Sequence, residues 1–143
     1  MKKILIVALL AFSLVGCTGG SKEVTKVCTF EVSGTKTSME LVAKDGKTVS
    51  EIIQTASANL EELGVSEEAF QEIVSQLKGK FNVDGVVYTV DVKDGIATEK
   101  WIIDVKKAGT QQLADMGMMQ SGADIIDLNE SVKQLTASGF TCK

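Results

Sequence analysis

Residues 37–58 read TSMELVAKDGKTVSEIIQTASA, two apolar–polar stretches on either side of Asp45-Gly46. An Asp-Gly dipeptide between such stretches is a strong signal for a β-hairpin, because both residues tolerate the positive φ that a two-residue turn requires. The first stretch predicts a strand over 37–44, and the second predicts a strand over 47–58. An antiparallel pair is therefore expected at this point of the chain.

A third strand is expected before this pair. Residues 24–33 alternate in the same way, and a turn near Gly34 sets Phe30 opposite Met39, which in turn faces Ile52 across the Asp-Gly loop. In this register one face of the three strands is apolar and the other is charged, and that agreement supports the pairing. The apolar face holds Cys28, Phe30, Val32, Met39, Leu41 and Ile52, and the charged face holds Glu31, Lys36, Glu40 and Glu51.

A second Asp-Gly hairpin is predicted around Asp94-Gly95, with strands over 85–92 and 96–105. A two-residue loop pairs Tyr88 with Trp101, which are the only tyrosine and the only tryptophan of the chain. Aromatic cross-strand pairs contribute roughly 0.2–1 kcal/mol beyond an Ala–Ala pair. The contact is therefore expected to help fix the register.

Helices are expected between and after these hairpins. Ser66 caps a helix over 66–79 whose apolar side chains recur at helical spacing. A poorer, glycine-interrupted helix is expected over 110–119, and a better one over 127–138, where Gly139 suits the left-handed position of a Schellman ending. The order β-β-β-α-β-β-α-α predicts an α+β fold, a two-layer sandwich with helices packed on one face of an antiparallel sheet.

The N-terminus carries a targeting pattern. Lys2-Lys3 precede an apolar run over 4–14, and Leu14-Val15-Gly16-Cys17 places a cysteine directly after a small residue. This segment resembles a bacterial lipoprotein signal peptide. The resemblance implies cleavage before Cys17 and a diacylglycerol on its sulfur. An ordinary secretory signal, which would leave Cys17 as a stray thiol, is the alternative.

The signal divides the chain and predicts its location. We expect a signal peptide over 1–16, a lipidated flexible tether over 17–23 and a single α+β domain over 24–143. The expected location is the extracytoplasmic face of the bacterial cell membrane, with the lipid on Cys17 as the membrane contact. The apolar run is too short to span a bilayer, which takes roughly 17–25 residues.

Composition narrows the chemistry. The chain has 15 basic residues, all lysine, against 19 Asp and Glu, for a net charge of −4, and it has no histidine. An acidic chain without arginine argues against nucleic acid as a partner. The lack of histidine excludes Ser-His-Asp and Cys-His catalysis and the usual zinc sites. We expect no catalytic residues, no cofactor and no metal site.

Cysteine pairing is the next inference. Once Cys17 carries lipid, Cys28 and Cys142 are the two cysteines that remain. An even number of cysteines in an exported protein suggests a disulfide. Such a bridge would tie the first strand to the last residues. Two reduced, buried thiols are the first alternative. A redox-active pair is the second, although the cysteines lie far apart rather than in a Cys-x-x-Cys motif.

Three methionines, Met116, Met118 and Met119, form a cluster that allows two interpretations. Clustered thioethers bind soft Cu(I) outside the cytoplasm. Flexible filling of an irregular core or an apolar lip is the interpretation that we favour, because no histidine or free cysteine accompanies them.

The lipoprotein signal, the turn Lys44-Asp45-Gly46-Lys47-Thr48-Val49, Tyr88-Thr89 and Ser138-Gly139-Phe140 together resemble the YehR-like bacterial lipoproteins. The resemblance implies a small two-layer α+β domain on a lipid anchor, with no established activity. We therefore expect a cell-envelope lipoprotein that acts as an extracytoplasmic binding or interaction module, with an unknown ligand or protein partner. An extracytoplasmic enzyme or a thiol-redox protein using Cys28 and Cys142 is the alternative.

Overall fold

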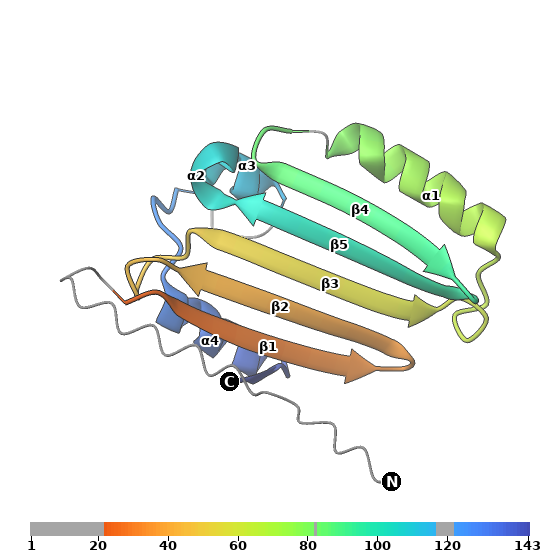
Figure 1. The fold of residues 1–143 in the computed structure, drawn as a ribbon, viewed down its shortest axis with the longest axis horizontal. Helices are drawn as coiled ribbons and strands as arrows, with labels where there is room; N and C mark the ends of the chain where they lie inside the picture. The colour runs from red at the N-terminus through yellow and green to blue at the C-terminus, as the bar shows by residue number, and fades with distance from the viewer. Residues whose placement is uncertain (1–21, 82, 117–121) are drawn as a thin grey trace, which may run out of the picture.

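The computed structural model describes residues 22–81, 83–116 and 122–143 of the chain. They form one six-stranded antiparallel sheet with strand order β4-β5-β3-β2-β1-β6, accompanied by short helices (Figure 1). The strands are β1 Val24–Val32, β2 Thr35–Ala43, β3 Glu51–Asn59, β4 Val86–Lys93, β5 Ile96–Asp104 and β6 Thr141–Cys142. The helices are α1 Glu67–Lys80, α2 Val105–Ala108, α3 Thr110–Asp115 and α4 Leu128–Ala137. The predicted α+β class and element order are confirmed, and α2 and β6 are additions that the sequence analysis missed.

The hairpin of β4 and β5 has the predicted register. Asp94 and Gly95 both have positive φ, 53° and 75°, as a tight two-residue turn requires. Tyr88 lies opposite Trp101, and their ring centroids are 4.2 Å apart. Local turn chemistry and the aromatic pair therefore agree on one register.

The hairpin of β2 and β3 differs from the prediction in its loop. Leu41, and not Met39, lies opposite Ile52, and Met39 pairs with Cys28 instead of Phe30. Both expected pairs were wrong by two positions. A shift of two residues leaves every side chain on its expected face, because side chains alternate with a period of two. The apolar face of the sheet is therefore the predicted one.

The shift arises because the chain leaves the sheet after Ala43 and re-enters it at Glu51. The carboxylate of Asp45 accepts hydrogen bonds from the backbone N–H groups of Lys47 and Thr48, at 2.8 and 2.6 Å. Residues 47–49 then pair with residues 126–128: the Val49 N–H donates to the Ile126 carbonyl, and the Leu128 N–H donates to the Lys47 carbonyl. A tertiary contact has replaced the two-residue turn.

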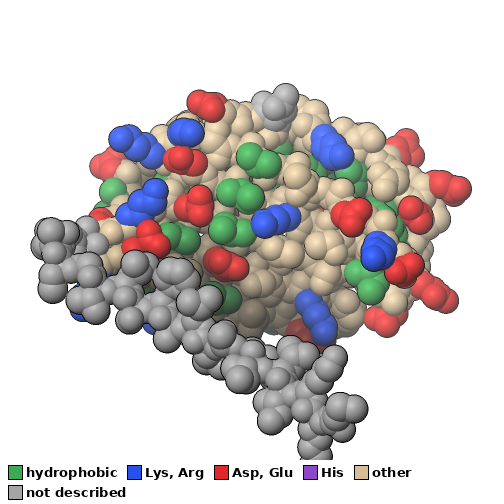
Figure 2. All heavy atoms as spheres, in the orientation of Figure 1, with side chains coloured by type: hydrophobic (Ala, Val, Ile, Leu, Met, Phe, Trp, Pro, Cys, Tyr) green, Lys and Arg blue, Asp and Glu red, His purple; other side chains and the backbone are tan. Residues whose placement is uncertain are grey.

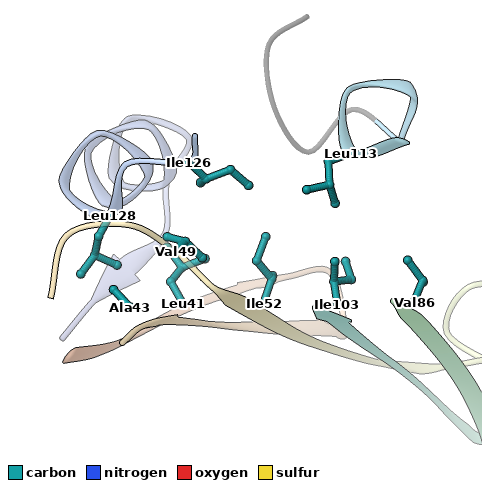
Figure 3. Packing of buried hydrophobic residues seen from close by; sticks show 9 residues of the cluster. All are labelled: Leu41, Ala43, Val49, Ile52, Val86, Ile103, Leu113, Ile126 and Leu128. Carbon is teal, nitrogen blue, oxygen red and sulfur yellow. The ribbon is translucent and has the colours of Figure 1, made fainter. Parts of the chain in front are cut away.

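One face of the sheet carries the core (Figure 3). Leu113 of α3 and Leu128 of α4, with Ile126 in the segment before α4, pack over apolar side chains that project from the strands. The buried cluster consists of Leu41, Ala43, Val49, Ile52, Val86, Ile103, Leu113, Ile126 and Leu128. The burial of these side chains is the main force that holds α3 and α4 on the sheet.

Helix α1 flanks the edge strand β4 instead of covering the face (Figure 1). Ser66 caps it as predicted, by accepting a hydrogen bond from the Ala69 N–H at 3.2 Å. Of its predicted apolar stripe, Val74 is buried, but Ile73 is 50% exposed. A helix beside an edge strand buries a narrower stripe than one that lies over a sheet.

The opposite face of the sheet faces solvent (Figure 2). Strand register sets Val27, Glu40, Ile53, Ile102 and Val87 in one row across five strands. Figure 2 shows apolar side chains near the middle of this face, surrounded by lysines and acidic residues. This face is mixed in character, as is typical of an antiparallel sheet with one solvated side.

The C-terminus closes the β1 edge of the sheet. Helix α4 ends in a Schellman motif, in which the N–H groups of Gly139 and Phe140 donate to the Thr136 and Leu135 carbonyls. Gly139 has φ +96°, and the Phe140 ring stacks on Phe30 with centroids 5.2 Å apart. The chain then adds β6 beside β1, which places Cys142 next to Cys28.

Candidate functional site

A groove of about 580 Å³ lies on the helix-covered face of the sheet, between α4 and the segment that follows α1. Its floor is formed by sheet side chains, among them Met39, Leu41 and Ile52, and its walls include Leu135 of α4 and Phe81. Small-molecule sites are typically apolar concavities of about 300–1,000 Å³ with a few polar groups. The groove has the size and the character of such a site.

An aromatic cluster forms one wall of the groove. Trp101 packs against Tyr88, with an interplanar angle of 36°, and against Phe81 in an edge-on contact with centroids 4.8 Å apart. Trp101 and Phe81 both line the groove. Because two rings pack on it, the Trp101 side chain is restrained in its position at the wall of the groove.

Glu99 is the only ionisable side chain among the residues that line the groove in the described part of the chain. It lies two residues from Trp101 on β5 and therefore on the same face of the sheet. The Tyr88 hydroxyl donates a hydrogen bond of 3.0 Å to its Oε1 atom. Burial and the bond to Glu99 raise the pKa of Tyr88 well above the usual 10, so that this hydroxyl stays a donor even in alkaline solution.

Two serines on α4 add hydroxyl groups to the lining, but both already donate to backbone carbonyls. Ser131 Oγ donates to Asp127, and Ser138 Oγ donates to Gln134. Such local bonds are the ordinary behaviour of serine in helices. Neither serine has the hydrogen-bonded base that an activated nucleophile requires.

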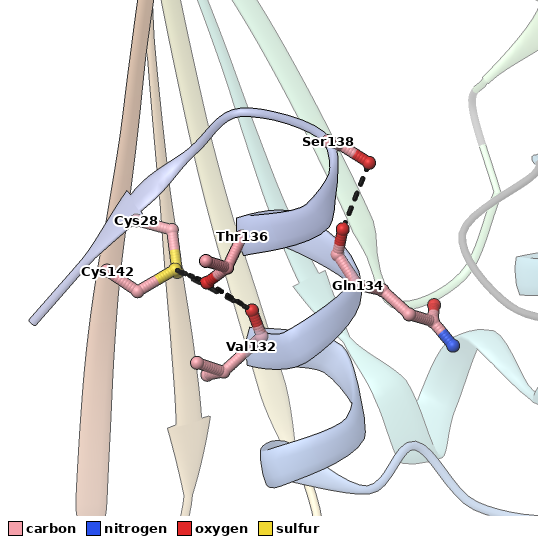
Figure 4. Close-up of a disulfide and its surroundings, with 6 residues drawn as sticks. All are labelled: Cys28, Val132, Gln134, Thr136, Ser138 and Cys142. Atoms are coloured by element: carbon pink, nitrogen blue, oxygen red, sulfur yellow. Dashed lines mark hydrogen bonds between the residues drawn. A yellow bond between two sulfur atoms is a disulfide. The ribbon is translucent and has the colours of Figure 1, made fainter.

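Cys28 and Cys142 form a disulfide with an S–S distance of 2.04 Å, so the structure contains the bridge that the sequence suggested (Figure 4). The cysteines are direct cross-strand partners on β1 and β6, and Cys28 has no exposed surface. The Cys142 sulfur lies 3.7 Å from the Thr136 hydroxyl of α4. Cys28 is buried and Cys142 is half-buried beside α4. A cross-strand bridge with one fully buried cysteine favours a structural role, because both cysteines of a reactive pair must be accessible to exchange.

The remaining sequence-predicted residues are mostly outside the described part of the chain. Cys17, Met118 and Met119 lie there, and only Met116 of the methionine cluster is placed, at the rim of the groove against the core. Residues 22–81, 83–116 and 122–143 contain no group of three metal-ligating side chains close enough to hold an ion. In the same residues, no helix is long and apolar enough to cross a bilayer.

Sequence reasoning found the Tyr88–Trp101 pair but missed its role as a groove wall, and it missed Glu99 altogether. Glu99 carries a signal that could have found it. It occupies a position of the apolar face of β5, between Ala97 and Trp101, where a charged residue breaks the alternation. A charge that breaks the apolar alternation of a strand is a local conflict of the kind expected at functional positions.

Comparisons with known proteins agree with the fold. A family model described as a protein of unknown function, DUF1307, matches residues 24–141. An uncharacterized lipoprotein of Listeria innocua, Lin0239, is 27% identical over 96% of this chain and 91% of its own length.

The NMR structure of the Escherichia coli YehR protein matches with a TM-score of 0.72 and 22% identity. The match covers 87% of this chain and 93% of that one, and it shows a shared fold. The resemblance to YehR-like lipoproteins that was expected from the sequence is confirmed. The chain belongs to the DUF1307 family of proteins of unknown function.

Proposed function

We propose that the protein is a lipid-anchored binding protein on the extracytoplasmic face of the bacterial cell membrane, and that its ligand occupies the groove beside Trp101. The observation that carries this proposal is the groove itself: an apolar floor, a fixed aromatic wall and a single carboxylate in about 580 Å³. No element of the proposal requires a catalytic group.

The anchor in this proposal is a diacylglycerol on Cys17. Support comes from Leu14-Val15-Gly16-Cys17 and from the similarity to an uncharacterized lipoprotein. In this proposal the signal peptide over 1–16 is removed, residues 17–23 tether the domain over 24–143, and the acyl chains do the anchoring. Each buried methylene contributes about 0.8 kcal/mol, so two or more chains give stable attachment even to an acidic protein.

Lipidation is tested with Cys17→Ser in a bacterium that exports the protein. The wild type is expected in the membrane fraction, with a mass that reflects cleavage before residue 17 and added lipid. Cys17→Ser is expected to keep its signal peptide and to carry no lipid. Identical processing and identical fractionation of the two proteins would contradict the anchor.

Ligand binding is tested through Trp101, which is the only tryptophan of the chain and lines the groove. The full processed protein, reconstituted in lipid vesicles, is screened with a small-molecule library for changes in tryptophan emission. Each hit is then measured on Gln54→Phe, which places a bulky ring in the groove opposite Trp101.

The matched control is Thr55→Phe, since the next residue of a strand points to the opposite face. A true groove ligand loses affinity for Gln54→Phe and keeps it for Thr55→Phe. Hits that bind both variants equally, or the lack of any hit, would count against the groove as the binding site.

The thiol-redox alternative has weaker support. Cys28 is fully buried and both cysteines are engaged in a cross-strand bridge, whereas exchange needs an attacking thiolate to reach a sulfur. The double variant Cys28→Ser/Cys142→Ser is expected to retain groove binding at a temperature at which it is still folded. Loss of binding without loss of fold would favour the redox alternative.

A further inference from the structure

We propose that the ligand of the groove is a small organic cation, an ammonium group carried on an apolar body. This inference rests on the proposed function, since it names the ligand class for the same groove. The observations that carry it are the charge of the lining, the position of Glu99 beside Trp101, and the apolar floor.

Among the described residues, the ionisable groups that line the groove carry negative charge only. Glu99 is the only ionisable residue of the lining within the described part of the chain, although the chain as a whole contains 15 lysines. An anionic ligand would therefore meet a carboxylate without a compensating cation. A neutral ligand could at best donate a hydrogen bond to Glu99 and would leave its negative charge uncompensated after water is removed, which is unfavourable. A cation satisfies the carboxylate and is the complementary partner.

The carboxylate of Glu99 is positioned to receive such a partner. Tyr88 donates one hydrogen bond, to Oε1, at 3.0 Å. A carboxylate has about four acceptor sites on its two oxygens, so capacity for an ammonium N–H remains. Tyr88 also packs on Trp101, so the same residue orients the carboxylate and supports the ring beside it.

The aromatic wall favours the same ligand class. Trp101 and Phe81 line the groove, with Trp101 two residues from Glu99 on β5, and aromatic rings attract a cation, most strongly tryptophan. The lining also contains apolar side chains, among them Met39, Met116 and Leu135. The groove thus combines a site for a positive charge with contacts for a hydrocarbon body.

The test uses three probes that share an apolar body and differ in the charge of one group: 4-phenylbutylamine, 4-phenylbutanol and 4-phenylbutyrate. They are titrated at neutral pH into the full processed protein in phosphatidylcholine vesicles, with Trp101 emission as the readout. The Gln54→Phe variant serves as the blank for probe that partitions into the lipid. We expect the amine to bind about ten-fold more tightly than the alcohol, as a charge-assisted hydrogen bond implies, and the carboxylate to bind most weakly.

Glu99→Gln removes the charge and keeps the size and an acceptor oxygen for Tyr88. It is expected to abolish the difference in affinity between the amine and the alcohol. Glu40→Gln is the matched control, because this substitution removes the same charge from the opposite face of the sheet. Retention of the amine preference in Glu99→Gln would overturn the inference.

A second variant provides an independent test if Glu99→Gln does not fold. Gln54→Lys places an ammonium in the groove opposite Trp101, which compensates the charge of Glu99, and it is expected to abolish the preference for the amine. An unchanged preference would overturn the inference.

The wild-type results separate the two proposals. Equal binding of all three probes, or tightest binding of the carboxylate, would overturn the cation inference and leave the groove as a ligand site. The lack of binding by any probe would count against both.

Discussion

The two Asp-Gly dipeptides of this chain have the same local signal and different structures. Asp94-Gly95 makes a two-residue turn, and pairing begins at once between Lys93 and Ile96. At Asp45-Gly46 the flanking strands end at Ala43 and begin at Glu51, and only the glycine has positive φ. Equal turn chemistry therefore produced a tight hairpin in one place and a longer loop in the other.

The difference lies in what surrounds each dipeptide. A Cβ atom at Gly95 would meet nothing within 4 Å, whereas one at Gly46 would lie 2.9 Å from the Lys22 carbonyl. Val49, three residues after Gly46, is 1% exposed and packs in the core. The comparison teaches that a turn signal decides the loop where nothing else competes, and that core burial decides it where the loop can reach the core.

The largest effect is expected where the longer loop meets α4. Leu128 is 2% exposed, and its backbone N–H donates to the Lys47 carbonyl of the loop. Leu128→Ala removes the buried side chain and should lower the free energy of unfolding by about 2–5 kcal/mol. Ile96→Ala beside the tight turn removes a side chain that is 47% exposed, and it should cost less than about 1 kcal/mol. Urea unfolding of both variants measures the difference. Equal losses would show that core contact does not distinguish the two loops.

The next effect concerns the disulfide, which ties down the chain that follows α4. The double variant Cys28→Ser/Cys142→Ser should lose about 2–4 kcal/mol of stability, since the bridge closes a loop with a sequence separation of 114 residues. Thermal melting with and without reductant measures it. Reductant should lower the melting temperature of the wild type and leave that of the double variant unchanged. A wild type that is insensitive to reductant while its thiols become alkylated would contradict a stabilising bridge.

A smaller effect is expected from the backbone of the tight turn. Gly95→Ala forces a side chain into a position with φ +75°, which should cost roughly 1–2 kcal/mol, while Gly95→Asn should cost less because asparagine tolerates this conformation. Gly46→Ala should lower the free energy of unfolding more than Gly95→Ala does. Both alanines would adopt an unfavourable positive φ, but the Cβ atom at position 46 would also lie too close to the Lys22 carbonyl. Denaturation of the three variants gives the order. The reverse order for the two alanine variants would break the comparison.

The smallest effect is a pH dependence at Asp45. Hydrogen bonds from the Thr48 and Lys47 N–H groups lower the pKa of this carboxyl from 3.8. A lowered folded-state pKa gives stability that is present above the unfolded pKa and is lost as pH falls through the folded one. The stability advantage of the wild type over Asp45→Asn should therefore be constant above about pH 5 and shrink in acid. A difference that stays constant down to about pH 2 would show that the ionised carboxylate does not hold the loop.

The candidate site shows the limit of sequence reasoning more clearly than the loops do. Tyr88 and Trp101 could be paired from the sequence, because the turn at Asp94-Gly95 fixes which residues face each other. The groove beside them could not be predicted. It needs Phe81 after α1, Leu135 of α4 and Met39 of β2 to meet around Trp101, and these residues are distant in the chain. No periodicity within one segment contains that information.

The sequence by itself determined the features that depend on neighbours along the chain: the strands and the face of each side chain, the cap at Ser66, and the Schellman ending at Gly139. The tertiary structure decided the path of the loop over 44–50, the added strand β6, the position of α1 at the sheet edge and the groove. The physical reason is one of range. Hydrogen bonds and turn geometry act over a few residues, whereas the burial of Val49 and Leu128 depends on segments that meet only when the chain is folded.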